Sequence, residues 1–268
     1  MTRRLKQIFS ISLLALLLAG CASPRHRVAQ GLQALLPADV ILLGEQHDAD
    51  AHRRVQRAFV EILAERAQLA ALALEMADRG RSTAGLARDA DAQQVRDALH
   101  WNDSGWPWAR YAPVVMAAVG RGIPVLGANL PSAAMRPSMS DTRFDQHLSG
   151  PALARQRDAI RIGHCDLLPE ERLTLMLRVQ LARDASMAGA VMDAVVPGKT
   201  VLLIAGGGHV LRDVGVPTHL PAALQVRTVL AVAGPTREGA AGQADWVWET
   251  APLAPRDHCA ELRRQLRR

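Results

Sequence analysis

The sequence predicts an α/β fold in which a mostly parallel, buried sheet is flanked by helices in a single domain. Short runs rich in valine, isoleucine and leucine alternate along the chain with segments of helical periodicity. The runs are continuously apolar, which is typical of parallel strands that are buried on both faces. No long linker of serine, glycine or proline divides the 268 residues, so one large domain is expected.

The N-terminus has the order of a secretory signal. A basic start with three positive charges and no acid is followed by an apolar run over 8–18, which is too short to span a bilayer stably. The run ends in Leu-Leu-Ala-Gly directly before Cys21, which matches the lipobox where a lipid is attached and the peptide is cut. We predict a signal peptide over 1–20, a lipidated polar tether over 21–30 and the folded domain over 31–268.

Loss of the signal changes the charge of the chain and the roles of its cysteines. The formal charge of +6 falls by three to +3, and nucleic acid is not implied as a partner. Ala22 is not the aspartate that commonly retains lipoproteins at the inner membrane, so we expect an outer-membrane lipoprotein of the cell envelope. Cys165 and Cys259 remain as an even pair in a compartment that permits disulfides, and we predict that they are bridged.

The strands and helices follow from the pattern of apolar residues. Each predicted strand is short, apolar and followed by polar or glycine residues, and the five lie at 40–45, 72–76, 125–129, 201–205 and 226–232. An amphipathic helix is predicted over 50–66, and a second one over 173–196 ends at a Pro-Gly pair. The stretch over 129–150 contains two prolines and is predicted to be an excursion or lid.

Polar side chains close or follow four of the predicted strands. Glu45 and His47 come with the first, Glu75 and Asn129 end the next two, and His209 follows three glycines after the fourth. The carboxyl ends of parallel strands share one edge, where such folds place ligands, so we expect the five to converge. They are suited to acid–base work, to binding a divalent metal or to forming the polar floor of a pocket. Alternatively, Glu45 and Glu75 have only a structural role, as buried carboxylates fixed by backbone donors.

Two polar residues interrupt the apolar stripe of the long helix. Gln180 and Asp184 lie one turn apart and continue the positions of its leucines and methionines, so they face inward. They form either one wall of a site or an internal hydrogen-bond network.

The segment WNDSGWPWARY over 101–111 carries much of the aromatic surface of an aromatic-poor chain. Aromatic side chains with a polar tip, such as Trp106, suit a flat hydrophobic ligand or an interface, although they can also pin a loop to the body of the protein. Tyr111 is the single tyrosine of the chain. Because tyrosinate can ligate ferric haem iron, it is a candidate ligand if haem is bound.

Five blocks of sequence form a specific combination. They read ILLGEQHDADAHRRVQ at 41–56, LALEM at 72–76, GWPWARYAPVVMAAVGRGIPVLGANLP at 105–131, QLARDASMA at 180–188 and LLIAGGGHVLRDVGVPTHL at 202–220. Together they resemble, in family order, the ChaN-like haem-binding lipoproteins, a branch of the Tiki and erythromycin-esterase superfamily. The resemblance implies an α/β fold and a tethered lipoprotein of a Gram-negative bacterium. It also implies haem binding linked to iron uptake, in a homodimer that holds its haems face to face.

The resemblance further implies roles for single residues. The family's haem iron is held by tyrosine, which corresponds here to Tyr111, and the residues that would line the adjacent pocket are Glu45, His47, Glu75, Trp106, Asn129, Gln180, Asp184 and His209. Hydrolases of the wider superfamily use equivalent Glu and His residues, which makes a metal-assisted periplasmic esterase or peptidase the alternative, with Glu45, His47, Glu75 and His209 in the catalytic set. No nucleophilic Ser or Cys with a His partner is evident, so water would have to attack. The resemblance to the ChaN branch favours binding over catalysis.

Overall fold

A computed structural model describes residues 24–236, 239 and 241–266, so the predicted signal peptide and Cys21 lie outside the described residues. Six strands are present: β1 Val40–Glu45, β2 Leu69–Asp78, β3 Val125–Asn129, β4 Thr200–Gly206, β5 Val226–Ala233 and β6 Trp246–Thr250. The helices are α2 Pro24–Leu35, α3 Asp50–Glu65, α4 Ala92–Leu99, α5 Trp108–Val119, α6 Ser132–Met139, α7 Gly150–Gly163, α8 Glu170–Asp193 and α9 His258–Leu266. Short 3-10 turns are η1 Thr142–Gln146, η2 Gly207–Val210, η3 Val216–His219 and η4 Ala241–Gln243.

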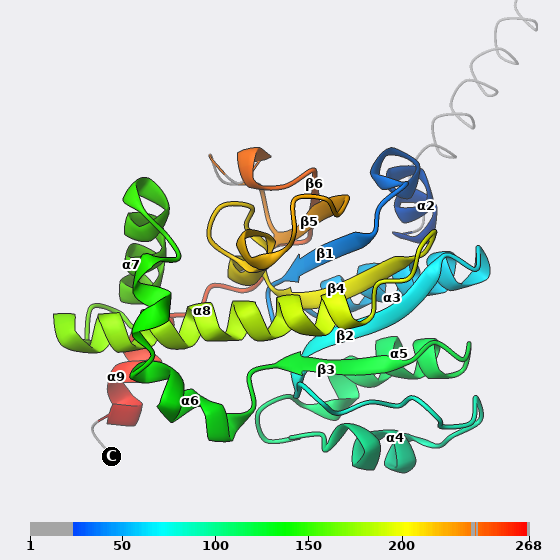
Figure 1. Cartoon of the computed structure of the whole chain (residues 1–268), viewed down its shortest axis with the longest axis horizontal. Coiled ribbons are helices and arrows are strands. Elements are labelled where there is room, and N and C mark those ends of the chain that lie inside the picture. The colour runs from blue at the N-terminus through cyan, green and yellow to red at the C-terminus, as the bar shows by residue number, and fades with distance from the viewer. Residues whose placement is uncertain (1–23, 237–238, 240, 267–268) are drawn as a thin grey trace, which may run out of the picture.

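The strands form one parallel sheet in the order β3-β2-β4-β1-β5-β6 (Figure 1). Its two central strands, β1 and β4, are buried along their whole length. From β1 the chain moves to one side of the sheet and from β4 it moves to the other, so the strand order reverses between these two neighbours. Ligands of open α/β sheets bind outside the carboxyl ends of the strands at such a reversal.

Helices cover both faces of the sheet, as the predicted fold class requires. Side chains alternate between the faces along β1. Ile41 and Leu43 pack into the core beneath α2, α3 and α5, whereas Leu42 packs with Met187 and Val191 of α8. Figure 1 shows α8 crossing one face of the sheet while α3 and α5 lie on the other. The predicted α/β fold with a mostly parallel, buried sheet is confirmed.

The boundaries of several elements differ from the prediction. The second strand runs over Leu69–Asp78 instead of 72–76, because its flanking alanines and its last residues still pair with neighbouring strands. The sixth strand, Trp246–Thr250, was not predicted, since a five-residue edge strand that is mostly half-buried has only a short apolar run. The long helix is shifted to Glu170–Asp193 from the predicted 173–196.

The polar tether predicted over 21–30 is shorter than expected. Helix α2 begins at Pro24, and Val28 is fully buried together with Leu32 against α3. The helix belongs to the core because every fourth residue is apolar, a pattern hidden within an otherwise polar stretch. Within the described ranges, no helix is long and apolar enough to cross a bilayer.

The predicted excursion over 129–150 is largely helical and packs against α8. It contains α6 and η1, and Arg178 of α8 donates to the carbonyl of Met139 and to both oxygens of Asp145. Leu148, at its end, shares an apolar cluster with Leu177 of α8. The segment therefore forms an outer layer on the helix that carries Gln180 and Asp184.

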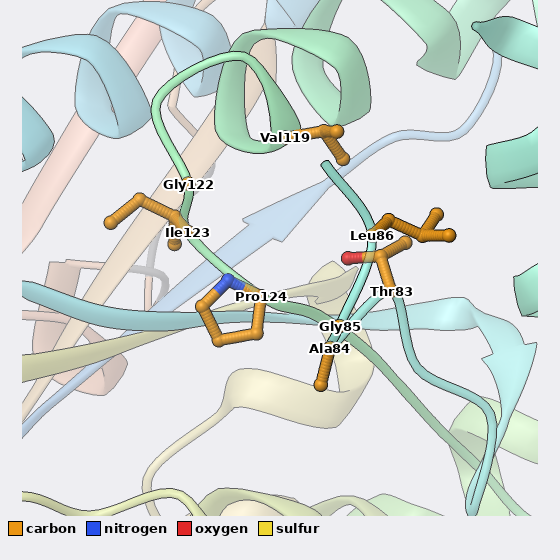
Figure 2. Close-up of a pocket in the computed structure, with 8 residues that line it drawn as sticks. All are labelled: Thr83, Ala84, Gly85, Leu86, Val119, Gly122, Ile123 and Pro124. Carbon is orange, nitrogen blue, oxygen red and sulfur yellow. The ribbon is translucent and has the colours of Figure 1, made fainter. Parts of the chain in front are cut away.

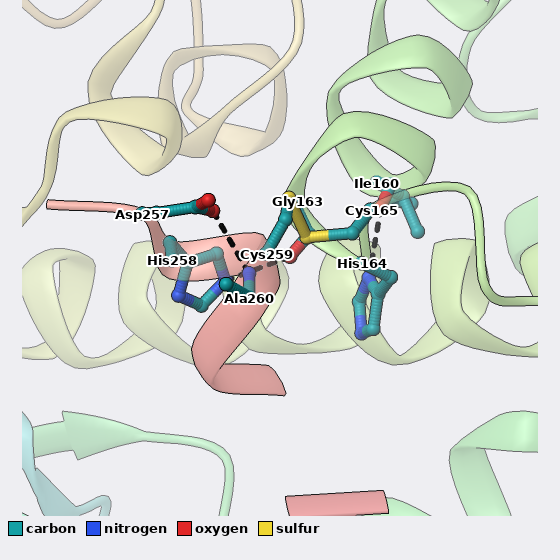
Figure 3. The surroundings of a disulfide bond; sticks show 8 residues. All are labelled: Ile160, Gly163, His164, Cys165, Asp257, His258, Cys259 and Ala260. Atoms are coloured by element: carbon teal, nitrogen blue, oxygen red, sulfur yellow. Dashed lines mark hydrogen bonds between the residues drawn. A yellow bond between two sulfur atoms is a disulfide. The ribbon is translucent and has the colours of Figure 1, made fainter. Parts of the chain in front are cut away.

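The predicted disulfide between Cys165 and Cys259 is present. Figure 3 shows that it joins the turn between α7 and α8 to the first residues of α9. His258 strengthens the junction, because its Nε2 lies 3.2 Å from the carbonyl oxygen of Gly163. The segment over 251–257 that leads to α9 is exposed and has no regular structure, so the disulfide fixes the C-terminal end of the described chain.

Candidate functional site

The first half of the site is built around the carboxylate of Glu45, the last residue of β1. This side chain is buried and accepts hydrogen bonds from Arg53, Gln56 and Tyr111, the last at 2.9 Å. Arg53 and Gln56 are three residues apart on α3, which places them on the same side of the helix. The fourth partner is His47, whose Nδ1 lies 2.7 Å from the carboxylate. Burial of this charge is thus compensated by one cation and several donors.

Arg53 connects the carboxylate to its surroundings. Its guanidinium donates to the carbonyl of His47 at 2.7 Å and to the hydroxyl of Tyr111 at 3.1 Å, and it lies over the tyrosine ring at 4.3 Å. Only 5% of Arg53 is exposed. This arginine therefore fixes both the backbone and the side-chain environment of His47.

Tyr111 is enclosed within this network. It is 2% exposed, and its hydroxyl donates to Glu45. Burial, and then the charge of Glu45, raise the pKa of Tyr111 well above its usual range. A neutral phenol held inside the protein does not present the exposed tyrosinate that the predicted role as iron ligand requires. Ligation by Tyr111 would require the hydroxyl to leave Glu45 and lose its proton, and its role as iron ligand stays a prediction.

The second half of the site surrounds Glu75 of β2. Its carboxylate accepts from the backbone N–H of Gly206 and from Arg183, each at 2.6 Å, and Nε2 of His209 lies 3.5 Å away. Burial alone would raise the pKa of Glu75, but His209, followed by Arg183 and His47, lowers it below its usual range. Glu75 is therefore a buried anion surrounded by positive groups.

His209 is held between two carboxylates. Its Nδ1 lies 2.5 Å from Asp184, and the amide of Gln180 approaches the ring at 3.2 Å. Burial favours the neutral imidazole, but Asp184 and then Glu75 outweigh it and raise the pKa of His209 to about 10. His209 is thus a cation near neutral pH, which suits charge balance and not the role of a general base.

Helix α8 supplies most of the polar groups in this half. Gln180, Arg183 and Asp184 lie on one side of it, and Arg183 donates from Nε to the side-chain oxygen of Asn129 at 3.0 Å. Gln180 and Asp184 do face inward, and both take part in a hydrogen-bond network. One oxygen of Asp184 has no partner among the described residues.

His47 lies between the two halves and is their most accessible member. Its side chain is 39% exposed, and Nε2 lies 3.8 Å from Glu75, beyond hydrogen-bond distance. Its ring meets Trp106 edge-to-face, with 4.8 Å between the ring centroids. When the imidazole is neutral and Nδ1 donates to Glu45, Nε2 keeps its lone pair, as in metal-binding histidines oriented by a carboxylate.

The structure thus brings Glu45, His47, Glu75 and His209 together, with Asn129, Gln180 and Asp184 behind them, at the edge where the strands end. Residues 31–220 match the family described as haem-binding uptake, Tiki superfamily, ChaN. The chain belongs to this ChaN family. Membership supports a function in haem binding and uptake.

Two solved structures share the fold of this ChaN-family chain. One, described as cofacial haem binding to ChaN of Campylobacter jejuni, has a TM-score of 0.66 and 24% identity and covers 82% of this chain and 90% of its own. The other, the type III effector HopBA1, has a TM-score of 0.52 and 14% identity over 87% of this chain and 95% of its own. At these identities the likeness shows the fold alone. No curated protein matches the sequence significantly.

The side chains of this ChaN-family site fit haem better than a bare divalent metal. His47 offers an accessible nitrogen beside an aromatic ring, and the half-exposed Arg110 donates to the carbonyl of His47 at 3.3 Å and lies 3.5 Å from the exposed carboxylate of Asp50. The carboxylates of Glu45 and Glu75, in contrast, are already paired with Arg53 and Arg183. In the part of the chain that the structure describes, no three His, Cys, Asp or Glu side chains are placed to hold a metal ion. The metal-assisted hydrolase is therefore unsupported.

Four site residues were missed by sequence reasoning: Arg53, Gln56, Arg110 and Arg183. Arg53 and Gln56 are buried on α3, where both donate to Glu45, whereas the amphipathic pattern predicted over 50–66 does not identify which polar residues of the helix are buried. Arg183 adjoins Asp184 on the inward side of α8. The available signal was the buried carboxylate at each strand end, because such a charge requires a cation nearby.

Pockets in the surface agree only in part with this site. One lies beside Glu45, where its other lining residues are Gln46, Gly207, Leu230, Ala231, Val232, Ala233 and Pro235. Another, shown in Figure 2, is lined by Thr83, Ala84, Gly85, Leu86, Val119, Gly122, Ile123 and Pro124. The second contains none of the predicted site residues and includes Pro124, which precedes the start of β3, so it lies away from the strand ends that carry the site.

Proposed function

We propose that this chain is a lipid-anchored haem-binding protein of the outer membrane that takes part in haem and iron uptake and binds haem as a homodimer. The match of residues 31–220 to the ChaN haem-binding family carries the proposal. The lipobox that ends at Cys21 supports the anchor. Haem binding requires an accessible iron ligand, an apolar contact for the porphyrin and a cation for its carboxylates.

His47, Trp106 and Arg110 supply these three features on one surface. The imidazole is half-exposed and oriented by Glu45, and the indole packs against its edge. The guanidinium of Arg110 is 42% exposed and lies beside the His47 backbone. When bound, haem would supply an iron that accepts a nitrogen ligand and two propionates that favour a guanidinium. We assign the ligand role to His47, in place of the buried Tyr111.

A second subunit would complete the site. The patch formed by His47, Trp106 and Arg110 would contact a flat porphyrin from one side only, and the other side would remain in water. The structure of ChaN from Campylobacter jejuni is described as binding haem cofacially. A homodimer that closes two such patches on each other would remove both haems from water.

A hemin titration tests the function and the ligand together. Protein that begins at residue 22 should give a saturable shift of the Soret band, and light scattering should show a dimer in the presence of hemin. His47→Ala should change the band or abolish it, whereas Tyr111→Phe should keep it. Loss of the band in Tyr111→Phe alone, with the fold intact by circular dichroism, would return the ligand role to the tyrosine.

The lipid anchor has its own test. The full-length chain should fractionate with the outer membrane and incorporate labelled palmitate, and Cys21→Ala should do neither. Cys165→Ser is the matched control, because it also replaces one cysteine by a smaller residue but leaves the lipobox intact. Membrane association of Cys21→Ala equal to that of the natural chain would refute the anchor while leaving haem binding untouched.

A further inference from the structure

Two histidines outside the haem site stack face to face. The rings of His147 and His219 are 3.8 Å apart between centroids and 5° from parallel. His147 follows η1 in the excursion over 129–150, and His219 ends η3 in the loop over 211–220 that follows His209. The pair thus joins two segments that are far apart in the sequence.

Further contacts surround the stack. Nε2 of His147 lies 2.8 Å from the hydroxyl of Thr218, which donates to the carbonyl of Gly215. Leu148 and Val214 pack in one apolar cluster on α8. Nε2 of His219 is buried and has no hydrogen-bond partner among the described residues, so this ring contributes its face and not a hydrogen bond.

The loop fixed by this contact lies directly on the candidate site. A Cβ atom built on Gly215 would be 2.1 Å from the carbonyl oxygen of His209, so the two backbones are in close contact. Helix α8, which supplies Gln180 and Asp184, contacts η1 and η3 as well. Separation of the two histidines would therefore loosen the covering around His209.

The surroundings of the stack disfavour a positive charge. Burial lowers the pKa of both rings, and for His219, where the charge of His147 adds to the effect, the pKa falls to about 4. The charged groups on the adjoining elements are already paired with one another: Asp141 with Arg143, Asp145 with Arg178, and Asp213 with Arg155. No carboxylate of these elements is free to compensate a protonated imidazole.

We propose that His147 and His219 form a proton-operated latch: the neutral rings stack and hold the excursion against the loop after His209, whereas protonated rings repel each other and release it. The open form would expose the Glu75–His209–Asp184 side of the site in mildly acidic surroundings. The latch does not depend on whether haem is the ligand.

The direction of the pH effect follows from linkage. The closed form binds protons more weakly than an open one in which the histidines are solvated, so the closed form is fully favoured above about pH 6.5 and loses its advantage as the pH falls toward 4. For His219 alone, the lowered pKa corresponds to a roughly thirty-fold increase in the equilibrium constant for opening at pH 5. Since the ring is partly exposed, we expect about tenfold.

Amide hydrogen exchange at pH 7.5 and pH 5.0, with times scaled for the intrinsic exchange rates, tests the latch. Protection of peptides from 141–150 and 211–220 should fall about tenfold at the lower pH, while β1 and β4 stay protected. In His219→Phe the ring can still stack but cannot be protonated, and its buried Nε2 has no hydrogen bond to lose, so the pH response should shrink to the part that His147 contributes. His100→Asn, an exposed position with φ of 47°, is the matched control and should keep the response.

Equal protection of both segments at the two pH values would overturn the proposal, as would an undiminished response in His219→Phe. If that variant does not fold, NMR titration of the natural protein decides. The midpoints of His147 and His219 should lie below the value of about 6.5 for a solvated histidine, and midpoints at or above it would overturn the latch.

Discussion

Nδ1 of His47 lies 2.7 Å from Oε1 of Glu45, while Arg53 and Gln56 hold the other oxygen of that carboxylate. The half-exposed imidazole is therefore oriented by a buried group that has no freedom to turn. Because Nδ1 is committed to Glu45, Nε2 is the nitrogen left for a ligand. We therefore expect substitutions of the residues that orient His47 to affect both the stability of the protein and haem binding.

Glu45→Ala should destabilise the protein by about 3 kcal/mol, because it leaves the buried guanidinium of Arg53 without its carboxylate. Urea unfolding followed by circular dichroism measures this. The double variant Glu45→Ala/Arg53→Met should lose less than the two single changes together. Asp193→Ala removes the exposed pair with Arg79 and should cost no more than about 1 kcal/mol. Equal costs for the buried and the exposed pair would contradict the role of Glu45.

Gly206→Ala should weaken hemin binding about tenfold, a size typical of changes to the groups that orient a ligand. A Cβ atom at this position would lie 2.9 Å from Nε2 of His47, and the φ of −57° accepts alanine. Gly208→Ala is the matched control, since its Cβ would meet nothing within 4 Å. Hemin titrations of the two variants should therefore differ. Identical affinities would show that the position of His47 does not matter.

Stability should decline on the alkaline side of neutrality because of His209. Its pKa is raised to about 10 in the folded protein, so its contribution is complete below about pH 6.5 and is lost as the pH rises toward 10. The slope approaches one proton, or about 1.4 kcal/mol per pH unit. Urea unfolding at pH 7, 8 and 9 should show this decline, and His209→Gln should flatten it. A parallel decline in the variant would assign the effect to other groups.

Reduction of the disulfide should release the C-terminal segment. The bond between Cys165 and Cys259 closes a loop over a sequence separation of 94, which in the chain-entropy model stabilises the fold by about 4 kcal/mol. A reducing agent should therefore lower the melting temperature and speed tryptic cleavage after Arg256. Cys165→Ser should already melt at the lower temperature and should not respond to the agent. An unchanged digestion pattern on reduction would mean that other contacts hold α9.

The fold was predictable because its first five strands are largely apolar and each is followed by polar or glycine residues. That signal fails where burial is partial. The edge strand β6 has one buried residue, Trp248, and the buried residues Val28 and Leu32 of α2 lie in a polar stretch of sequence. Both elements are stabilised by packing against a neighbouring element, and the local sequence pattern carries no information about that packing.

The carboxylates and histidines of the site could be predicted from the sequence, but its arginines could not. The positions of Glu45, Glu75 and His209 at or after strand ends identify them in the sequence. The parallel topology of the sheet then brings them together. In the sequence, Arg53 and Arg183 resemble surface residues of amphipathic helices. Only the folded structure shows that each pairs with a carboxylate of the sheet. The enclosure of Tyr111 likewise depends on α5 packing against α3, which spacing along the chain does not specify.

The most direct measurement is the absorbance spectrum of the protein as isolated from haem-replete cells, set beside its metal content. We predict a Soret band, with iron as the main metal and in proportion to that band, and no stoichiometric zinc or other divalent ion. A colourless protein that carries a stoichiometric divalent metal and does not bind added hemin would contradict haem binding and would revive the metal-assisted hydrolase.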